Sequence, residues 1–435
     1  RDGRPTFASS LMLHAFRLTR PGEEVTFKHL REAAGEPASQ VPAAPDAALG
    51  DAGWWLSSLK HAPKTGLQRV HEAFPDRMRG MAAEAARASD VFTEFDGLAP
   101  SAAQVLDPRT SGRPVSPTSL EKLAACPFAY FLKAGLRLDP IQEDERDLDA
   151  WLDPLTRGSL LHELFAQTMR HLREAKEKPG LKRHLAWLKA RADAALAALG
   201  ETMPPPSDEV FNRERDDIYR DLEVFLGTEE LAAKEDGITP VGFEVGFAGY
   251  GQAGDEPLGQ AEPVAIRLPG ARFPLNGRID RIDRLRDGSY QVVDYKTGTL
   301  CWAGYSGVFR HGRLLQHALY AVAAESLLRA KQDPSAKVTS GRYRFPTVKG
   351  AGRSKVIPRP PDRDLGRVVA AVLDIAAAGA FMARTEAKDK KACEYCDFAG
   401  TCEGAPVVAR AAAKLDNPAN EALEPWRRLQ GEENA

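Results

Sequence analysis

The sequence predicts an α/β fold, in which a mixed sheet core is flanked by helices. Three observations predict it. Apolar residues recur at helical spacing before residue 235 and again after residue 313. Several segments between residues 241 and 295 instead alternate apolar and polar residues, as strands do. Arg286-Asp-Gly-Ser289 joins two of these segments, and because Asp-Gly suits a tight turn, they are expected to form an antiparallel hairpin.

Helices are expected along most of the chain. Residues 1–112 combine short helical stretches with Pro- and Ala-rich joints and hold no catalytic motif. Thr118 or Ser119 is expected to cap a helix that runs through Cys126 to Phe131, and an acidic connector follows. A break is expected at Met203-Pro-Pro-Pro206. The remaining predicted helices cover residues 10–18, 26–34, 54–61, 158–176, 180–235, 313–330 and 364–383, with a charged helical tail after the last cysteine.

The predicted strands cluster in one part of the chain, with one addition after the helix at 313–330. They cover residues 241–250, 264–268, 275–285, 290–295 and 342–346.

Composition limits the classes of protein. The 435 residues carry a formal net charge of −2, so a nucleic-acid surface would be a local patch. The sequence has no phosphate-binding loop of the G-x-x-x-x-G-K-[ST] type, so ATP hydrolysis is not expected. The apolar stretch 368–383 contains Asp374 and is too short to cross a bilayer. We therefore expect a soluble, cytoplasmic protein with no membrane contact.

The hairpin carries a group of charged residues suited to metal chemistry. Gly277-Arg-Ile-Asp280 lies on its first strand and Val293-Asp294-Tyr295-Lys296 on its second. Asp280 and Asp294 would lie side by side, and Asp294 and Lys296 share one face because side chains alternate along a strand. Two carboxylates suit Mg²⁺ or Mn²⁺. The alternative is an ordinary hairpin whose charged face is exposed to solvent.

The order of motifs resembles the RecB/AddB-like branch of the PD-(D/E)XK nuclease family. The matching elements are the hairpin, the upstream segment Gly158-Ser-Leu-Leu-His162 and the downstream segment Leu315-Gln316-His-Ala-Leu-Tyr320. The resemblance covers residues 114 to 405 and implies a restriction-endonuclease-like fold. It implies that His162, Asp280 and Asp294 bind the metal with help from the Tyr295 carbonyl. It also implies that Lys296 is the catalytic lysine and that Gln316 and Tyr320 complete the site.

The sequence departs from the family pattern in places. Ile279-Asp280 stands where the superfamily name has Pro-Asp. Glu244 resembles an acid on the preceding strand, and its place in the site or on the surface stays open. Asp283 is an additional acid that would support the metal or pair with Arg281 or Arg284. Alone, His162 would be a packing residue.

Four of the five cysteines form a second pattern. Cys393, Cys396 and Cys402 follow the spacing C-x2-C-x5-C, and Cys126 precedes a proline near the start of the matching region. By spacing alone, four thiolates fit a structural Zn²⁺ or an iron–sulfur cluster. The resemblance implies a 4Fe-4S cluster that staples the two ends of the nuclease together. Cys301 is the remaining thiol, packed or free.

Two basic stretches are candidates for phosphate contact. One borders the hairpin, and the other includes a Gly-rich loop at 349–353. The residues singled out for nucleic-acid binding are Arg278, Arg281, Arg342 and Arg344. The alternative is a solvated loop. No pattern indicates base readout, so contact with DNA is expected to be independent of sequence.

Together these features predict a metal-dependent deoxyribonuclease of exonuclease type. The family resemblance further implies that it acts on single strands or duplex ends in recombinational repair, beside a helicase partner. Residues 1–112 would be a helicase-like remnant or docking region, 113–405 the nuclease domain and 406–435 the tail. One alternative is a non-catalytic DNA-binding or scaffold subunit, and another is a nuclease stabilised by zinc without iron.

Overall fold

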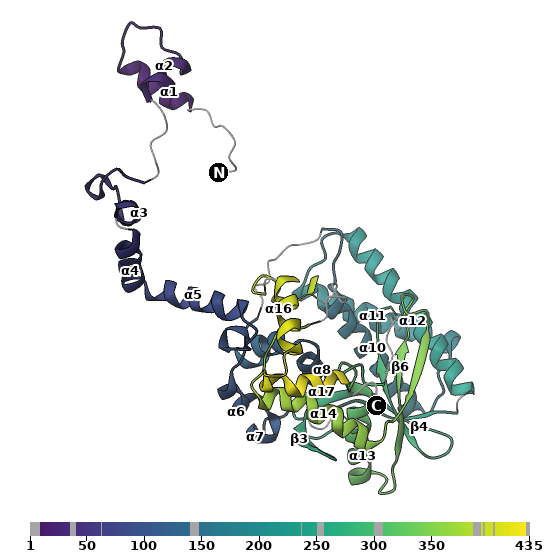
Figure 1. The fold of residues 1–435 in the computed structure, drawn as a ribbon. Coiled ribbons are helices and arrows are strands. Elements are labelled where there is room, and N and C mark those ends of the chain that lie inside the picture. The colour runs from purple at the N-terminus through teal and green to yellow at the C-terminus, as the bar shows by residue number, and fades with distance from the viewer. Residues whose placement is uncertain are drawn as a thin grey trace. The chain divides into compact units, whose positions relative to one another are not determined.

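The computed structural model of the chain forms two compact units, Arg1–Glu84 and Ala85–Ala435 (Figure 1). It describes residues 9–34, 41–61, 63–139, 148–235, 237–249, 256–299, 308–385, 393–394, 396–402 and 405–431. None of the helices within these ranges is long and apolar enough to cross a membrane. The cytoplasmic location and the three-part domain division stay predictions.

The first unit is helical. Its elements are α1 (Ser10–Leu18), α2 (Phe27–Ala34), η1 (Pro45–Ala47), α3 (Asp51–His61), α4 (Pro63–Ala73) and most of α5 (Pro75–Ala88). Ser9 caps α1 by accepting a hydrogen bond from the backbone N–H of Met12. A small core of Leu13, Val25 and Leu30 lies between α1 and α2. The helices expected at 10–18, 26–34 and 54–61 are confirmed.

A five-stranded mixed sheet organises the second unit. Its strand order is β1-β4-β5-β6-β7, and the pair β5–β6 is parallel while the other pairs are antiparallel. A separate antiparallel pair is formed by β2 and β3. The strands are β1 (Thr239–Phe247), β2 (Val264–Leu268), β3 (Ala271–Leu275), β4 (Gly277–Arg284), β5 (Tyr290–Tyr295), β6 (Val338–Phe345) and β7 (Arg353–Pro358). The predicted mixed α/β class is confirmed.

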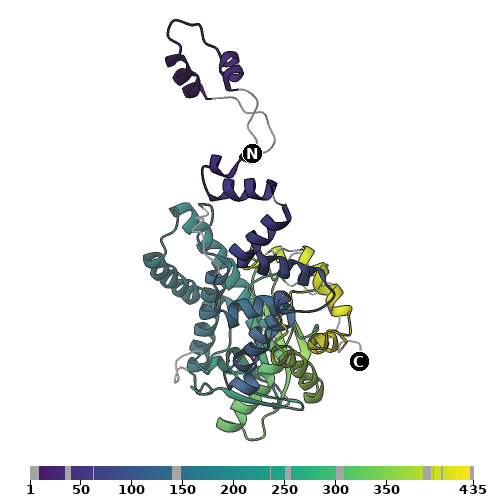
Figure 2. The same cartoon turned by 60° about the vertical axis from the view of Figure 1, so that its left-hand side comes forward.

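Helices cover both faces of this sheet (Figures 1 and 2). One core joins Phe243, Val293 and Tyr295 of the sheet to the long helices α10, α11 and α12, and the other joins Ile282 and Val292 to α8, α13 and α14. The helical elements are η2 (Glu94–Asp96), η3 (Pro100–Ala102), α6 (Ala103–Leu106), α7 (Pro108–Ser111), α8 (Pro117–Ala125), α9 (Pro127–Tyr130), the π-helical turn η4 (Phe131–Gly135), α10 (Pro154–Ala175), α11 (Leu181–Thr202), α12 (Asp208–Glu235), α13 (Gln316–Lys331), α14 (Asp362–Ala377), α16 (Ala405–Asp416), η5 (Glu421–Leu423) and α17 (Glu424–Gly431).

The hairpin that joins β4 to β5 forms as predicted. Gly288 has a positive φ of 83°, which glycine adopts without a steric penalty. Its N–H donates to the carbonyl of Leu285 at 3.0 Å, and the Leu285 N–H donates to Ser289 at 2.8 Å. This short turn fixes the register in which β4 and β5 pair.

The predicted start and course of the helix through Cys126 were wrong. Ser116 caps α8 through the N–H of Ser119, and Pro117 occupies the first helical turn. The helix then stops at Ala125. Cys126 is extended, with φ −158° and ψ 93°, because a residue before proline is disfavoured in the helical conformation. The thiol of Cys126 therefore lies at a break between α8 and α9.

Other predicted elements had wrong limits. The strand expected at 275–285 is β4, which begins at Gly277, because Asn276 separates it from β3. The Gly-rich loop expected at 349–353 is a turn, and it leads into β7, which was not predicted. The strand expected at 241–250 ends at Phe247, and residue 250 lies outside the described residues. The helix expected to reach residue 383 ends at Ala377. At Gly379, where φ is 63°, a Cβ would lie 2.4 Å from the Ala99 carbonyl oxygen, so the chain turns there instead.

Candidate metal centre

The hairpin brings the two predicted aspartates together. Arg281 pairs with Val293 across β4 and β5, so Asp280 and Asp294 are opposite each other one step further along. The backbone N–H of Tyr295 donates to Asp280 Oδ2 at 2.8 Å. Lys296 Nζ lies 2.7 Å from Asp294 Oδ2, as expected for residues on the same face. The local geometry that the sequence predicted for these residues is therefore present.

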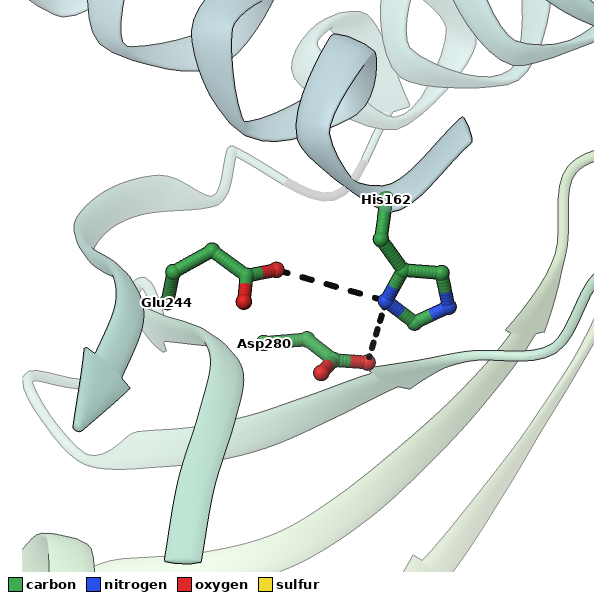
Figure 3. Close-up of side chains that lie close together, drawn as sticks. All are labelled: His162, Glu244 and Asp280. Atoms are coloured by element: carbon green, nitrogen blue, oxygen red, sulfur yellow. Dashed lines mark ion pairs between the residues drawn. The ribbon is translucent and has the colours of Figure 1, made fainter. Parts of the chain in front are cut away.

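Helix α10 supplies a histidine to the same place. Asp153 caps this helix through the N–H groups of Leu155 and Thr156, and Pro154 begins it. His162 Nδ1 lies 3.5 Å from Asp280 Oδ2 and 4.0 Å from Glu244 Oε1 (Figure 3). The histidine thus faces the sheet carboxylates.

Glu244 belongs to the site and not to the surface. It lies in β1 with a positive φ of 50°, a conformation that non-glycine residues rarely adopt and that costs about 1–3 kcal/mol. Its side chain is 8% exposed, and Arg278 Nε lies 2.7 Å from Glu244 Oε2. Figure 3 shows the Glu244 carboxylate directed toward His162. Strained backbone of this kind is concentrated at functional sites.

These side chains form a donor set for one cation. Ligand atoms of His162, Glu244 and Asp280 all lie within 4.8 Å of one another. Within the described part of the chain, no other group of three histidine, cysteine or acidic side chains meets this criterion. One imidazole nitrogen and several carboxylate oxygens suit a divalent cation such as Mn²⁺ or Mg²⁺.

The electrostatics of the site favour a bound positive charge. Burial and the nearby Asp280 raise the pKa of Glu244 to about 7. Burial raises the pKa of Asp294 to about 6, although Lys296 opposes the change. Burial disfavours the charged imidazole, but Asp280 and Glu244 outweigh it and raise the pKa of His162 to about 8. Each shift reflects crowded negative charge with little solvent to screen it.

A second group of residues surrounds Lys296. Its Nζ donates to Gln316 Oε1 at 3.1 Å, and Gln316 is the first residue of α13. Tyr320, one turn later, is 7% exposed. A Cβ at Gly277 would lie 2.8 Å from the Tyr320 hydroxyl, so glycine leaves space for that ring. The structure therefore brings Gln316 and Tyr320 to the site, as the resemblance implied.

Two residues near Lys296 were not singled out from the sequence. Glu121 Oε1 accepts hydrogen bonds from the N–H groups of Leu315 at 2.7 Å and Gln316 at 2.9 Å. Lys296 Nζ lies 5.7 Å from the centroid of the Tyr343 ring. Burial raises the pKa of Glu121 to about 7, while the N–H groups of Leu315 and Gln316 oppose this change. No local sequence signal marks either residue, because both contacts depend on tertiary structure.

A cleft opens beside the candidate metal-binding side chains. Its volume is about 540 Å³, and its lining includes His162 and Lys296. Gly158 and Ser159 of α10 contribute one wall, and Thr297 after β5 contributes another. Gly158 has no side chain to fill this wall, and the hydroxyl groups of Ser159 and Thr297 can donate hydrogen bonds to a group bound in the cleft.

The four predicted nucleic-acid contacts divide into two groups. The Arg278 side chain is 49% exposed and borders the site. Arg342 is partly buried, and its Nε donates to Gln291 at 3.2 Å. Arg281 and Arg344 are buried and both pair with Glu229 of α12. Phosphate contact by these two was therefore a wrong expectation, because strand alternation directs them into the core under α12.

Asp283 does not support the metal. It is fully buried, and its carboxylate accepts hydrogen bonds from Arg281 Nε at 2.5 Å and Gln291 Nε2 at 3.3 Å. The sequence left metal support and arginine pairing open, and the structure has the arginine pair.

The predicted cluster cysteines are all partly buried. The pKa of the Cys126 thiol is raised, first by burial and also by the thiols of Cys396 and Cys402. Backbone N–H groups of Ala129 and Arg384 lie against the Cys126 sulfur and oppose that rise. Cys301 lies outside the described residues.

Comparison with known proteins gives one family and a consistent set of relatives. Residues 114–403 match the PD-(D/E)XK nuclease superfamily. Proteins named as one subunit of an ATP-dependent helicase/deoxyribonuclease are 30% identical in Clostridium novyi over 195 residues and 31% identical in Natranaerobius thermophilus over 194 residues. These matches cover 41% and 42% of this chain. They span only 15% of the length of each relative.

Proposed function

Since the chain belongs to the PD-(D/E)XK nuclease superfamily, we propose that its second unit is a metal-dependent deoxyribonuclease of exonuclease type that hydrolyses phosphodiester bonds. The observation that carries the proposal is the meeting of His162, Glu244 and Asp280 in one donor set beside Asp294 and Lys296. A surface hairpin with scattered charge would not bury these carboxylates together.

The ligand set fits Mg²⁺ or Mn²⁺. His162, Asp280, Asp294 and the Tyr295 carbonyl would hold the cation, and Glu244 would support it. When bound, such a cation acidifies a water molecule and offsets charge on the scissile phosphate. The crowded carboxylates described above are the feature of this chain that favours it.

Lys296 has the position of a catalytic ammonium group. Burial disfavours its charge, but Asp294 outweighs that effect, so the pKa of Lys296 is raised and the group stays protonated. Asp294 and Gln316 hold Nζ at the edge of the cleft. From there, Nζ would donate to a phosphate oxygen or orient the attacking water. Gln316 and Tyr320 would keep Lys296 in place.

The substrate we propose is a single strand or duplex end, bound without regard to base sequence. Arg278 and the hydroxyl groups of Ser159 and Thr297 are donors that would contact phosphates along the cleft. The names of the relatives combine a helicase with a deoxyribonuclease. We therefore propose a helicase partner and a role in DNA end processing and recombinational repair.

The cysteines would hold a 4Fe-4S cluster that ties the start of the nuclease to its end. Cys126 precedes the sheet in the chain, and Cys393, Cys396 and Cys402 follow it. The effect of the Cys396 and Cys402 thiols on the pKa of Cys126, and the backbone N–H groups that contact Cys126, support such a site. A Zn²⁺ ion is the alternative occupant.

Cleavage of single-stranded DNA tests the nuclease proposal. Wild type should cut with Mg²⁺ or Mn²⁺ and stop with chelator, whereas Asp294→Ala and Lys296→Ala should each lose about a hundredfold or more in kcat. Asp287→Asn, in the turn of the same hairpin, is the matched control and should keep full activity. Full activity in both site variants would exclude the assignment. Absence of cutting by folded wild type, with DNA binding intact, would favour the scaffold alternative.

A further inference from the structure

We infer that Glu121 is a positioning residue that holds Gln316 in contact with Lys296; this inference rests on the nuclease function proposed above. Glu121 belongs to α8, and its Oε1 accepts the N–H groups of Leu315 at 2.7 Å and Gln316 at 2.9 Å. The two partners are 194 and 195 residues away in the chain. The contact therefore joins two segments that only the fold brings together.

The start of α13 needs an acceptor from elsewhere. The first N–H groups of a helix have no partner within it, and a polar residue at the cap position usually supplies one. Leu315 occupies that position in α13 and has no polar side-chain atom. Glu121 provides the missing acceptor, and its ionised form also suits the positive end of the helix dipole.

The same turn carries a group that contacts the catalytic lysine. Gln316 Oε1 accepts from Lys296 Nζ at 3.1 Å, and Lys296 Nζ lies 2.7 Å from Asp294 Oδ2. A continuous series of contacts thus runs from Glu121 through Gln316 to Lys296. If the first turn of α13 frays, Gln316 moves and Lys296 loses one of the two groups that orient it.

The rest of α13 does not depend on this cap. Most of its residues are buried, including Ala318, Leu319, Ala321 and Leu328, and the helix packs against β5 and β6 of the sheet, β2 and α8. Loss of Glu121 should therefore disturb the first turn without unfolding the helix. An effect of Glu121 on catalysis can therefore be measured separately from an effect on the stability of the protein.

The test uses the full chain and single-stranded DNA cleavage with Mn²⁺. Glu121→Ala should lower kcat about tenfold to a hundredfold, because small displacements of catalytic groups have effects of this size. KM and DNA affinity measured with Ca²⁺ should stay at wild-type values, because Glu121 is not among the residues that line the cleft. Glu121→Gln keeps an oxygen that accepts the N–H groups, so it should recover most of the rate.

A double-variant comparison separates positioning from general stabilisation. In a Gln316→Ala background, Glu121→Ala should add little further loss of kcat, because both changes remove the same support from Lys296. The control is Glu325→Ala on α13, where Glu325 accepts the Val338 N–H at 3.0 Å away from the site. This variant should lower the melting temperature and leave kcat unchanged.

The outcomes distinguish the two proposals. Multiplicative losses in the double variant, full activity in Glu121→Ala, or a Gln variant no better than Ala would each overturn the positioning role while the nuclease assignment stands. Wild-type protein that cuts no DNA would overturn the nuclease proposal and this inference with it.

Discussion

Glu229 is a buried residue that connects the strands carrying the proposed metal ligands to α12. It is 1% exposed on α12, and its carboxylate lies 2.6 Å from Arg281 Nη1 and also pairs with Arg344. Arg281 Nη1 in turn donates to the Tyr295 hydroxyl at 3.0 Å. Glu229 thus joins α12 to three strands of the sheet, directly beneath the strand end that carries Asp294 and Lys296.

Replacement of Glu229 by Gln should destabilise the second unit by about 3 kcal/mol or more at pH 7, because Arg344 then stays buried without its counter-charge and Arg281 keeps only Asp283. Burial disfavours the Glu229 carboxylate, but Arg281 and Arg344 outweigh it, so its folded-state pKa is lowered from 4.5. The stability that the Glu229 carboxylate contributes is therefore fully present above pH 4.5. It is lost as the pH falls through the lowered pKa of the folded state.

Urea unfolding of wild type and Glu229→Gln at several pH values measures this contribution. The difference between them should be largest at neutral pH and shrink below pH 4.5. Glu223→Gln, a half-exposed acid on the same helix, is the control and should change stability little. Equal unfolding midpoints at pH 7 would contradict the prediction.

For single residues, the sequence predicts a contact only where the two partners are close together in the chain. Asp294 and Lys296 are two apart on a strand, so their shared face follows from strand geometry. The burial of Arg344 does not, because it depends on Glu229, which is 115 residues away. Glu121 was missed for the same reason.

Single elements depend on where prolines and glycines fall. Pro127 ends α8 and leaves Cys126 extended at the break, a position that a continuous helix would not give it. Strand β7 was missed because its first residues are charged or polar and it directly follows the Gly-rich turn, and both features argue against a strand. The hairpin between β4 and β5, by contrast, carries its turn signal in the sequence and forms as predicted.

The cysteine segment gives a prediction at the scale of elements. Cys396→Ser should release most of the bound metal from anaerobically purified protein and lower its melting temperature, because a bound group would close the long loop between Cys126 and the last cysteines. Iron and zinc analysis, with visible absorbance spectra, identifies the occupant. Ser119→Ala, on the nearby helix α8, should keep the metal. Unchanged iron and zinc in Cys396→Ser would contradict the ligand set.

On the scale of the whole molecule, the two largest buried cores of the second unit lie on opposite faces of the sheet. The proposed metal centre lies where α10 on one face, β1, β4 and β5 in the sheet, and α13 on the other face converge. The class of fold follows from the sequence because periodicity distinguishes helices from strands. The assignment of helices to faces depends on packing across the chain, so it becomes visible only in the structure.

The two units have separate hydrophobic cores, so the second should fold without the first. The first has Leu13, Val25 and Leu30, whereas the buried clusters around the sheet draw on residues from Phe92 onward. A fragment of residues 85–435 should therefore fold with the melting temperature of the nuclease unit in the full chain. Because every proposed ligand lies within it, the fragment should also cleave single-stranded DNA at the same rate.

Circular dichroism and the cleavage assay on the fragment check both statements, with Asp294→Ala in the fragment as the inactive control. A folded fragment with normal cleavage would assign the chemistry to the second unit and leave residues 1–84 to another task. A fragment that folds and binds DNA but cuts slowly would contradict the prediction, because the first unit would then contribute to catalysis. A fragment that fails to fold would contradict the independence of its core, on which the prediction rests.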